Sequence, residues 1–273
     1  MQLGSRGSAV ERSLTGDVPL RLESVSKTFH SRGGEVEAVR ELSLEVPRGE
    51  FVTVVGPSGC GKSTLMNLIV GLVEPTSGTI YYDGRVVDGI NTEIGYVTQD
   101  DNLFPWRTVL RNVEFGMEVR HFPAKERRER ALRFMERVGL RGFEKHYPHE
   151  LSGGMRQRAN IIRTLCYNPK VILMDEPFGP LDAQTRLQLQ AQLLDLWHEQ
   201  EDTTIVFITH DLVEAIALAD RVIVMTKRPG QIKKVYQVDL ARPRDVYTLQ
   251  FQEDFQKIYR DLWAVLETEV RGG

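Results

Sequence analysis

Gly56-Pro57-Ser58-Gly59-Cys60-Gly61-Lys62-Ser63-Thr64 follows the apolar run Phe51–Val55 and precedes the apolar helical stretch Leu65–Leu72. The segment satisfies the pattern Gly-x-x-x-x-Gly-Lys-Ser/Thr in the strand–loop–helix context of a phosphate-binding loop. Its glycines allow backbone N–H groups to curl around an anion, and the following helix start adds partial positive charge. Lys62 would bind the β- and γ-phosphates, and Ser63 would ligate Mg²⁺. The segment therefore predicts a nucleotide site that uses Mg²⁺.

A second segment, Leu151-Ser152-Gly153-Gly154-Met155-Arg156-Gln157-Arg158, narrows the class of nucleotide-binding protein. Leu-Ser-Gly-Gly-x-x-Gln-Arg is the signature of the ATPase subunits of ATP-binding cassette (ABC) transporters, and the chain resembles that family from about Leu20 to about Val238. The resemblance implies an α/β fold, namely a phosphate-loop NTPase ABC cassette. Such a cassette has an N-terminal antiparallel β layer, a RecA-like parallel-sheet core and an inserted helical subdomain. The alternative is a different phosphate-loop NTPase with a coincidental Leu-Ser-Gly-Gly, and the order of the other motifs disfavours it.

Hydropathy patterns indicate an N-terminal layer of strands followed by a helical region. Leu20–Val25 and Leu42–Val46 alternate apolar and polar residues, as half-buried strands do. Thr79–Tyr82 closes this β-rich layer. From Arg107 to about Tyr147, apolar residues recur at helical spacing while charges fill the other face.

The second half of the chain returns to an α/β pattern. Val171–Met174 and Thr204–Ile208 read as buried strands, separated by a helix over about Ala183 to Gln200. Strand, helix and strand in succession indicate a parallel sheet.

These patterns predict three segments. Residues 1–18, rich in Gly, Ser and Arg, are expected to form a flexible leader. Residues 19–240 form the ATPase domain, with its helical subdomain at about 100–165, and residues 241–273 form a C-terminal helical tail. The tail carries one apolar stripe that we expect to pack on the core: Phe251, Phe255, Ile258, Tyr259, Leu262 and Leu266.

Composition excludes several classes of function. The 273 residues carry a net charge of −3, so the chain has no basic footprint for nucleic acid. Cys60 and Cys166 lack the spacing of a metal site or a disulfide framework. Within the phosphate loop, Cys60 is either a small loop filler or a site where alkylation would block nucleotide binding. Because no apolar stretch approaches the roughly 18 residues of a membrane span, a transport function would need a separate membrane protein.

Two carboxylates follow a predicted buried strand, in Val171-Ile172-Leu173-Met174-Asp175-Glu176. Acids at the carboxyl end of a strand beside a phosphate loop suit Mg²⁺ and an attacking water. Asp175 would hold the metal, and Glu176 would orient or deprotonate the water, a role worth about 10² to 10⁴ in rate. The alternative is a solvated acidic turn, which the following Pro177 and the distance from the signature disfavour.

The resemblance implies further nucleotide contacts. His210, one strand after the acids, would sense the γ-phosphate and join Glu176 and Gln99 as the catalytic set. Gln99 would also approach Mg²⁺, together with Ser63 and Asp175, and would begin the segment that contacts the membrane subunit. Phe29 would stack on adenine, with plain core packing as its alternative.

Val36 and Val39 are further candidates for the base pocket. Asp182, after Leu181, matches the loop that crosses to an opposing subunit. Pro180 departs from the Ala or Ser that is commoner in the family, and proline lacks an N–H.

The signature implies a dimer, because Ser152, Gly153 and Gly154 form an anion site without a lysine. In the family, this site covers the γ-phosphate of the ATP that is held by Lys62 of the other copy. Two copies of this chain, or this chain and a close paralogue, would thus share two ATP molecules head to tail.

The absence of long insertions or a second cassette favours a bacterial importer over ABC proteins of DNA repair or translation. Three segments look like the nitrate/sulfonate/taurine importer branch: Leu103–Val109, Phe178–Asp182 and Met225–Gly230. This resemblance implies an integral membrane permease, a periplasmic or lipid-anchored substrate-binding protein, and a peripheral location on the cytoplasmic face of the inner membrane. The alternatives are a soluble ABC regulatory ATPase that switches by ATP-dependent dimerisation, or an importer of a pyrimidine precursor or bicarbonate.

Overall fold

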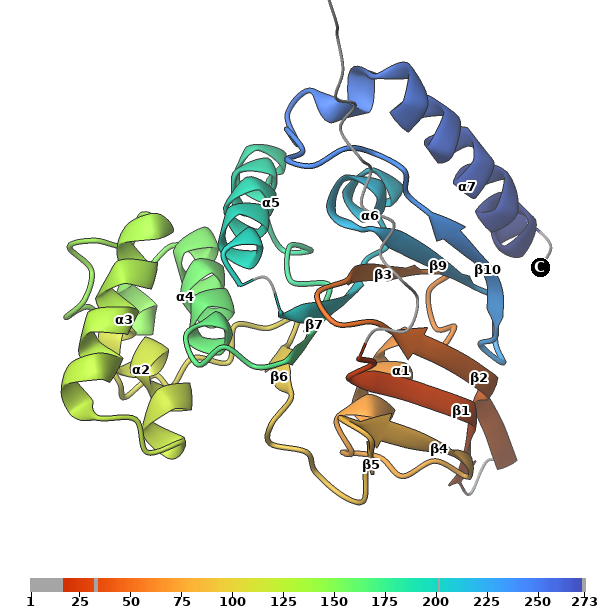
Figure 1. The fold of residues 1–273 in the computed structure, drawn as a ribbon, viewed down its shortest axis with the longest axis horizontal. Helices are drawn as coiled ribbons and strands as arrows, with labels where there is room; N and C mark the ends of the chain where they lie inside the picture. Colours follow the sequence, from red (N-terminus) through yellow and green to blue (C-terminus); the bar gives the residue numbers. More distant parts are fainter. Residues whose placement is uncertain (1–16, 32–33, 201, 272–273) are drawn as a thin grey trace, which may run out of the picture.

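The computed structural model describes residues 17–31, 34–200 and 202–271. Of the predicted leader, residues 1–16 lie outside the described residues. The strands of the described chain form two sheets, and most helices pack against the larger one (Figure 1).

The smaller sheet is antiparallel and has the order β2-β1-β4-β5. Its strands are β1 (Leu20–Ser31), β2 (Gly34–Val46), β4 (Ser77–Tyr82) and β5 (Arg85–Val86). The predicted N-terminal β layer is confirmed, although β1 and β2 are longer than their alternating patterns indicated. The register of β1 and β2 places Phe29 opposite Val36 near the hairpin end. This pairing sets both side chains at one end of the layer.

The larger sheet has the order β10-β9-β3-β8-β7-β6. Its strands are β3 (Phe51–Val55), β6 (Gly95–Val97), β7 (Val171–Asp175), β8 (Thr204–Ile208), β9 (Arg221–Met225) and β10 (Ile232–Gln237). Within this sheet, β9, β3, β8, β7 and β6 each run parallel to their neighbours in that group, which confirms the expected parallel core. Only β10 is antiparallel to its neighbour, at the edge.

The topology of this sheet positions the predicted site. The phosphate loop follows β3 in the middle of the sheet, Glu176 follows β7, and His210 lies two residues beyond β8. Since carboxyl ends of parallel strands meet at one edge of a sheet, these residues gather there despite their separation in sequence.

Alternation along β3 explains why the sheet has a core on each face. Phe51 and Val55 belong to the cluster that includes α5 (Ala183–His198), whereas Val52 and Val54 belong to the cluster that includes α1 (Lys62–Ile69). Helix α1 lies between the two sheets, and α5 lies on the opposite side of the larger sheet (Figure 1).

A helical region projects from the β6–β7 edge (Figure 1). It contains α2 (Val109–Val119), α3 (Ala124–Arg137), the short 3₁₀ helix η1 (Pro148–Glu150) and α4 (Gly153–Leu165). Thr108 caps α2 by accepting a hydrogen bond from the Arg111 backbone N–H at 3.4 Å. The helical periodicity predicted from Arg107 onward is confirmed.

The chain ends in α7 (Glu253–Arg271), which packs near α6 (Leu212–Leu218) and follows the 3₁₀ helix η2 (Leu249–Phe251). The predicted stripe is buried at Phe255, Ile258, Leu262 and Leu266 and partly buried at Tyr259. Phe251 was wrongly assigned to the stripe, because it precedes the helix and is 76% exposed. Among the described residues, none of the helices has the length and apolar character needed to cross a bilayer.

Candidate functional site

The phosphate loop has the backbone shape that its glycines permit. Gly59 and Gly61 have φ values of 72° and 105°, in the left-handed region. A Cβ at Gly61 would lie 2.7 Å from Val39 Cγ1 and 2.8 Å from the Ala38 carbonyl oxygen, so side-chain bulk is excluded as well. Glycine at this position therefore lets the loop pack directly on β2.

Lys62 begins α1 and is buried beneath the loop. Its Nζ donates to the carbonyl oxygens of Gly56 at 2.9 Å and Pro57 at 3.1 Å. These contacts hold the ammonium group at the loop. Cys60 is 1% exposed, with Sγ 3.9 Å from Lys62 Nζ, and burial raises the pKa of its thiol. This burial favours the loop-filler interpretation of Cys60, since a reagent could reach the thiol only if the loop opened.

The structure brings together the Ser63 hydroxyl and the Asp175 carboxylate, which hydrogen-bond each other. Burial raises the pKa of Asp175, the Ser63 hydrogen bond opposes this rise, and the Glu176 charge adds to it. A hydroxyl and a carboxylate are hard oxygen donors of the kind that Mg²⁺ takes, usually with several waters kept. The pair therefore fits the predicted Mg²⁺ ligands.

Glu176 and His210 also meet. Glu176 Oε2 lies 2.9 Å from His210 Nδ1, and the Glu176 backbone N–H donates to the Ile208 carbonyl at 3.1 Å. Glu176 has a left-handed φ of 45°, an uncommon conformation for a residue other than glycine. The turn after β7 thereby aims the carboxylate at the end of β8.

These residues line or adjoin a cleft of about 340 Å³, which we call the loop cleft. Its lining consists of Phe29, Val36, Ala38, Ser58, Gly59, Gly61, Lys62, Ser63, Thr64, Glu176 and Arg228. Phe29 and Val36 are each 40% exposed there, unlike core residues. Val39, by contrast, is fully buried beneath Gly61 and does not line the cleft, so its prediction as a cleft residue is wrong; its neighbour Ala38 lines the cleft instead.

Arg228 was missed as a site residue. It lies in the turn after β9, and its Nε and Nη2 donate to the Gly59 carbonyl oxygen at 3.2 and 3.1 Å. The two residues are 169 positions apart, and no local pattern connects them. Only the parallel pairing of β3 with β9 brings this turn to the phosphate loop.

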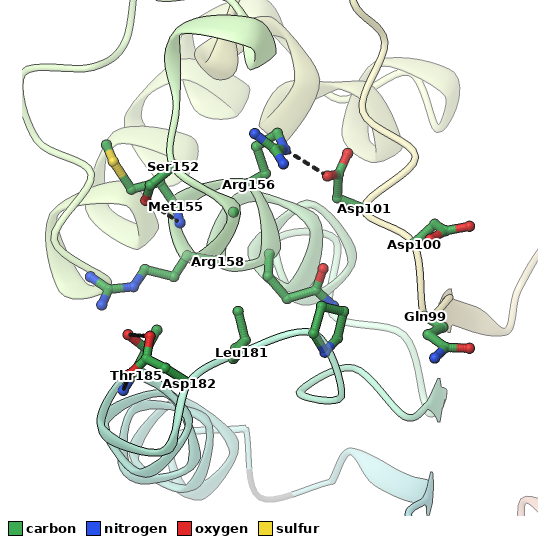
Figure 2. Close-up of a pocket in the computed structure, with 14 residues that line it drawn as sticks. Gln99, Asp100, Asp101, Ser152, Met155, Arg156, Arg158, Leu181, Asp182 and Thr185 are labelled. Carbon is green, nitrogen blue, oxygen red and sulfur yellow. Dashed lines mark hydrogen bonds and ion pairs between the residues drawn. The ribbon is translucent and has the colours of Figure 1, made fainter.

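A second cleft, of about 510 Å³, contains the signature and is shown in Figure 2. We call it the signature cleft. It is lined by Gln99, Asp100, Asp101, Ser152, Gly153, Gly154, Met155, Arg156, Gln157, Arg158, Pro180, Leu181, Asp182 and Thr185. No residue of this lining also lines the loop cleft.

Two helix starts face each other across the signature cleft (Figure 2). Ser152 caps α4 by accepting from the Met155 N–H at 3.3 Å, and Asp182 caps α5 by accepting from the Thr185 N–H at 3.0 Å. The bonds from Thr185 hold the pKa of Asp182 below its usual value. A Cβ at Gly154 would lie 2.9 Å from Thr185 Cγ2, so glycine allows the two helix starts to approach.

Side chains of α4 hold the segment that follows Gln99. Arg156 Nε bonds Asp101 Oδ2 at 2.9 Å, as Figure 2 shows, and Arg163 Nη1 donates to the Asn102 carbonyl at 2.8 Å. The signature helix is thus physically tied to the Gln99 segment. Sequence reasoning missed this connection, because arginines on a helix are ordinarily solvated.

The predicted site residues therefore fall into two groups. Phe29, the phosphate loop, Asp175, Glu176 and His210 gather at the loop cleft, whereas Ser152, Gly153, Gly154, Asp182 and Gln99 gather at the signature cleft. Gln99 nevertheless lies near the turn that follows Glu176 and contains Gly179. A Cβ placed on Gly179 would be 3.7 Å from Gln99 Nε2 and 3.3 Å from the Glu176 carbonyl oxygen.

Comparison with known proteins yields a family and close relatives. Residues 39–179 match the family model described as ABC transporter. The chain is 50% identical to an uncharacterized ABC transporter ATP-binding protein of Methanocaldococcus jannaschii, over 93% of each chain. It is 42% identical to a nitrate import ATP-binding protein of Synechocystis, covering 92% of this chain and 97% of that one. It is 43% identical to an aliphatic sulfonates import ATP-binding protein of Bacillus cereus, covering 87% and 93%.

A solved structure is also similar. It is a dimeric ATP-binding cassette in a post-hydrolysis state with ADP and Pi, with a TM-score of 0.72 and 34% identity. The match covers 81% of this chain and 100% of that one.

Proposed function

Because this chain belongs to the ABC transporter family and is an ATPase of that family, we propose that it powers an importer for a small anion or organosulfonate. In this proposal, ATP closes a dimer of the chain, hydrolysis reopens it, and the cycle drives a separate permease. The observation that carries the proposal is the division of the site residues between two clefts that share no lining residue.

Chemistry is assigned to the loop cleft. Lys62 and the loop N–H groups would bind the β- and γ-phosphates, and Phe29 would stack on the base. Bound Mg²⁺, held by Ser63, Asp175 and Gln99, would neutralise phosphate charge. Glu176 would orient the attacking water and accept its proton. His210 would sense the γ-phosphate and also hold the Glu176 carboxylate through the 2.9 Å contact.

A second copy would complete each site. The loop cleft has a lysine but no signature residue, and the signature cleft has two helix starts but no lysine. Apposing the signature cleft of one copy to the loop cleft of another would enclose the γ-phosphate from both sides. The dimeric state of the similar cassette with ADP and Pi supports a homodimer, or a dimer with a close paralogue.

The importer role rests on the relatives and on one surface. The Leu103–Val109 segment, which we assign to permease docking, carries Trp106 with 72% of its surface exposed. Phe104 packs against Phe115 at 4.7 Å and Trp106 at 5.5 Å, which fixes the base of this aromatic surface. The nitrate and sulfonate import relatives favour an anion as substrate. In the proposal, a separate binding protein delivers this anion, and the chain lies on the cytoplasmic face of the inner membrane.

The domain division is part of the proposal. Residues 19–240 would act as the ATPase domain, with the helical subdomain at about 100–165 linking the permease surface to the signature cleft. The Arg156–Asp101 and Arg163–Asn102 contacts would carry this link. Residues 241–273 would form the tail, whose helix α7 packs near α6.

Affinity capture tests the proposal. Tagged Glu176→Gln chain, bound to ATP, is isolated from detergent-solubilised membranes of the source cells, with Lys62→Ala as the matched control that cannot retain nucleotide. We expect a multi-span permease with the first variant, and its binding protein can then be titrated with nitrate, sulfonates, taurine, pyrimidine precursors and bicarbonate. Recovery of soluble partners alone, with the chain absent from membranes, would instead support an ATP-switched soluble regulator.

A further inference from the structure

The turn between β9 and β10 lies against the phosphate loop along much of its length. Gly230 exchanges backbone bonds with β2: its N–H donates to the Ala38 carbonyl at 2.9 Å, and its carbonyl accepts from the Arg40 N–H at 2.9 Å. A Cβ at Gly230 would lie 2.1 Å from the Cys60 carbonyl oxygen, so the two backbones are in direct contact. The turn therefore cannot shift without disturbing the loop or β2.

Arg228 of this turn extends along the loop cleft. A guanidinium has five N–H donors, and Arg228 donates to the Gly59 carbonyl oxygen from Nε and Nη2. The side chain is exposed and lines the cleft together with Lys62 and Ser58. A second fixed positive charge thus stands beside the phosphate loop.

Helix α7 also contacts the β9–β10 turn, through Glu269 near the end of the helix. Glu269 Oε2 accepts from the Lys227 backbone N–H at 2.9 Å, and Glu269 Oε1 accepts from Lys233 Nζ of β10 at 2.5 Å. The Glu269 side chain is only 13% exposed. The Lys233 ammonium, followed by the Lys227 N–H, holds the pKa of Glu269 below its usual value, so the carboxylate is charged at neutral pH.

We propose that Arg228 contacts the phosphate chain of the bound nucleotide, and that Glu269 positions Arg228 by fixing the backbone of Lys227. The inference rests on the proposed use of the loop cleft for ATP and assigns the tail a role in nucleotide affinity. Arg228 acts as a nucleotide contact, and Glu269 acts only through the turn. Because a charged fork can bond two phosphate oxygens, the effect applies to both ATP and ADP.

Measuring nucleotide binding by the isolated full chain tests the proposed roles of Arg228 and Glu269. ADP with Mg²⁺, and ATP with Mg²⁺ on a Glu176→Gln background, are titrated by calorimetry. We expect Arg228→Ala to raise both Kd values about tenfold, as loss of a charged hydrogen bond does, and Arg228→Lys to restore part of the affinity. Glu269→Gln is expected to raise Kd about threefold and to have no effect once Arg228 is alanine, because the two act in series.

Glu267→Gln is the matched control, since it removes the same charge from the same helix at a residue paired with Arg271 rather than with the turn. Its Kd is expected to match the wild type. In steady-state assays of Glu269→Gln, the KM for ATP should rise while kcat stays unchanged, a split that general destabilisation of the fold would not give.

Wild-type Kd values for ADP and ATP in Arg228→Ala would overturn the inference. So would a change confined to the preference between ATP and GTP, because that would place Arg228 at the base. Failure to capture a permease would refute the importer proposal while leaving these Kd changes intact, so the two ideas fail separately.

Discussion

Glu176 Oε2 and His210 Nδ1 lie 2.9 Å apart, although the two residues follow different strands and are 34 positions apart in sequence. Glu176 follows β7 and His210 follows β8, and the parallel pairing of these strands sets their ends side by side. This contact places a general-base candidate and its orienting group at one edge of the sheet, beside the phosphate loop.

Glu176→Gln should lower the turnover of ATP at least about 100-fold, because the amide keeps the shape of the side chain but cannot accept a proton. The variant should accumulate as an ATP-bound dimer. Single-turnover hydrolysis and size-exclusion chromatography with ATP measure the two effects. Hydrolysis at the wild-type rate would remove Glu176 from its assigned role.

His210→Ala should lower kcat about 10- to 100-fold, because Glu176 loses the group that orients it. The Kd for ATP should stay near the wild-type value, since His210 is not part of the lining of the loop cleft. His149→Ala is the matched control, because His149 lines neither cleft. Equal loss in both variants would indicate a general effect on the fold.

Lys62→Ala and Gly154→Ala should each abolish hydrolysis for different reasons. The first removes the ammonium group from the phosphate loop, so its Kd for ATP should rise at least about tenfold. The second places a Cβ 2.9 Å from Thr185 Cγ2 and disturbs the signature cleft. Because Gly154 does not line the loop cleft, the Kd of the monomer for ATP should be unchanged.

Mixing these two variants tests whether sites are shared between copies. A head-to-tail dimer of Lys62→Ala with Gly154→Ala contains one site built from an intact loop and an intact signature, and one site with both lesions. We expect the mixture to regain part of the ATPase activity that neither variant has alone. If each copy hydrolysed ATP by itself, mixing would restore nothing.

Glu214 should make stability depend on pH. It is 5% exposed and accepts from Gln190 Nε2 at 2.8 Å, and burial raises its pKa from 4.5 to about 7. The folded state therefore keeps a proton that the unfolded state releases above pH 4.5. The stabilisation is fully present below that pH and is lost as the pH rises through about 7, up to about 3 kcal/mol.

Glu214→Gln should therefore leave the free energy of unfolding nearly unchanged at pH 5 and raise it by about 1–3 kcal/mol at pH 8, because the amide stays neutral. Urea unfolding of both proteins at the two pH values measures the difference. An equal shift at pH 5 and pH 8 would show that Glu214 does not titrate as described.

Local sequence determined the parts of this protein whose chemistry is local. The phosphate loop could be predicted because two of its glycines meet a local backbone requirement, with left-handed φ values of 72° at Gly59 and 105° at Gly61. Asp175 and Glu176 at the end of β7 could be predicted, because an apolar strand that leads into two carboxylates beside a phosphate loop has few other functions. Ser152 and Asp182 likewise cap the helices that immediately follow them. In each case the feature that explains the residue lies within a few positions of it in the sequence.

Tertiary structure alone decided which of these segments meet. The pairing of β3 with β9 brings Arg228 to Gly59, and the packing of α7 brings Glu269 to Lys227, across 169 and 42 positions. Packing also buried Val39 beneath Gly61 and left Phe251 outside the apolar stripe of α7. The spacing of apolar residues predicts which face of a helix or strand is buried. Which neighbour that face contacts depends on the order of the strands and on how the helices pack. That order arises from burying both faces of one sheet, to which segments from across the chain contribute, so no single segment encodes it.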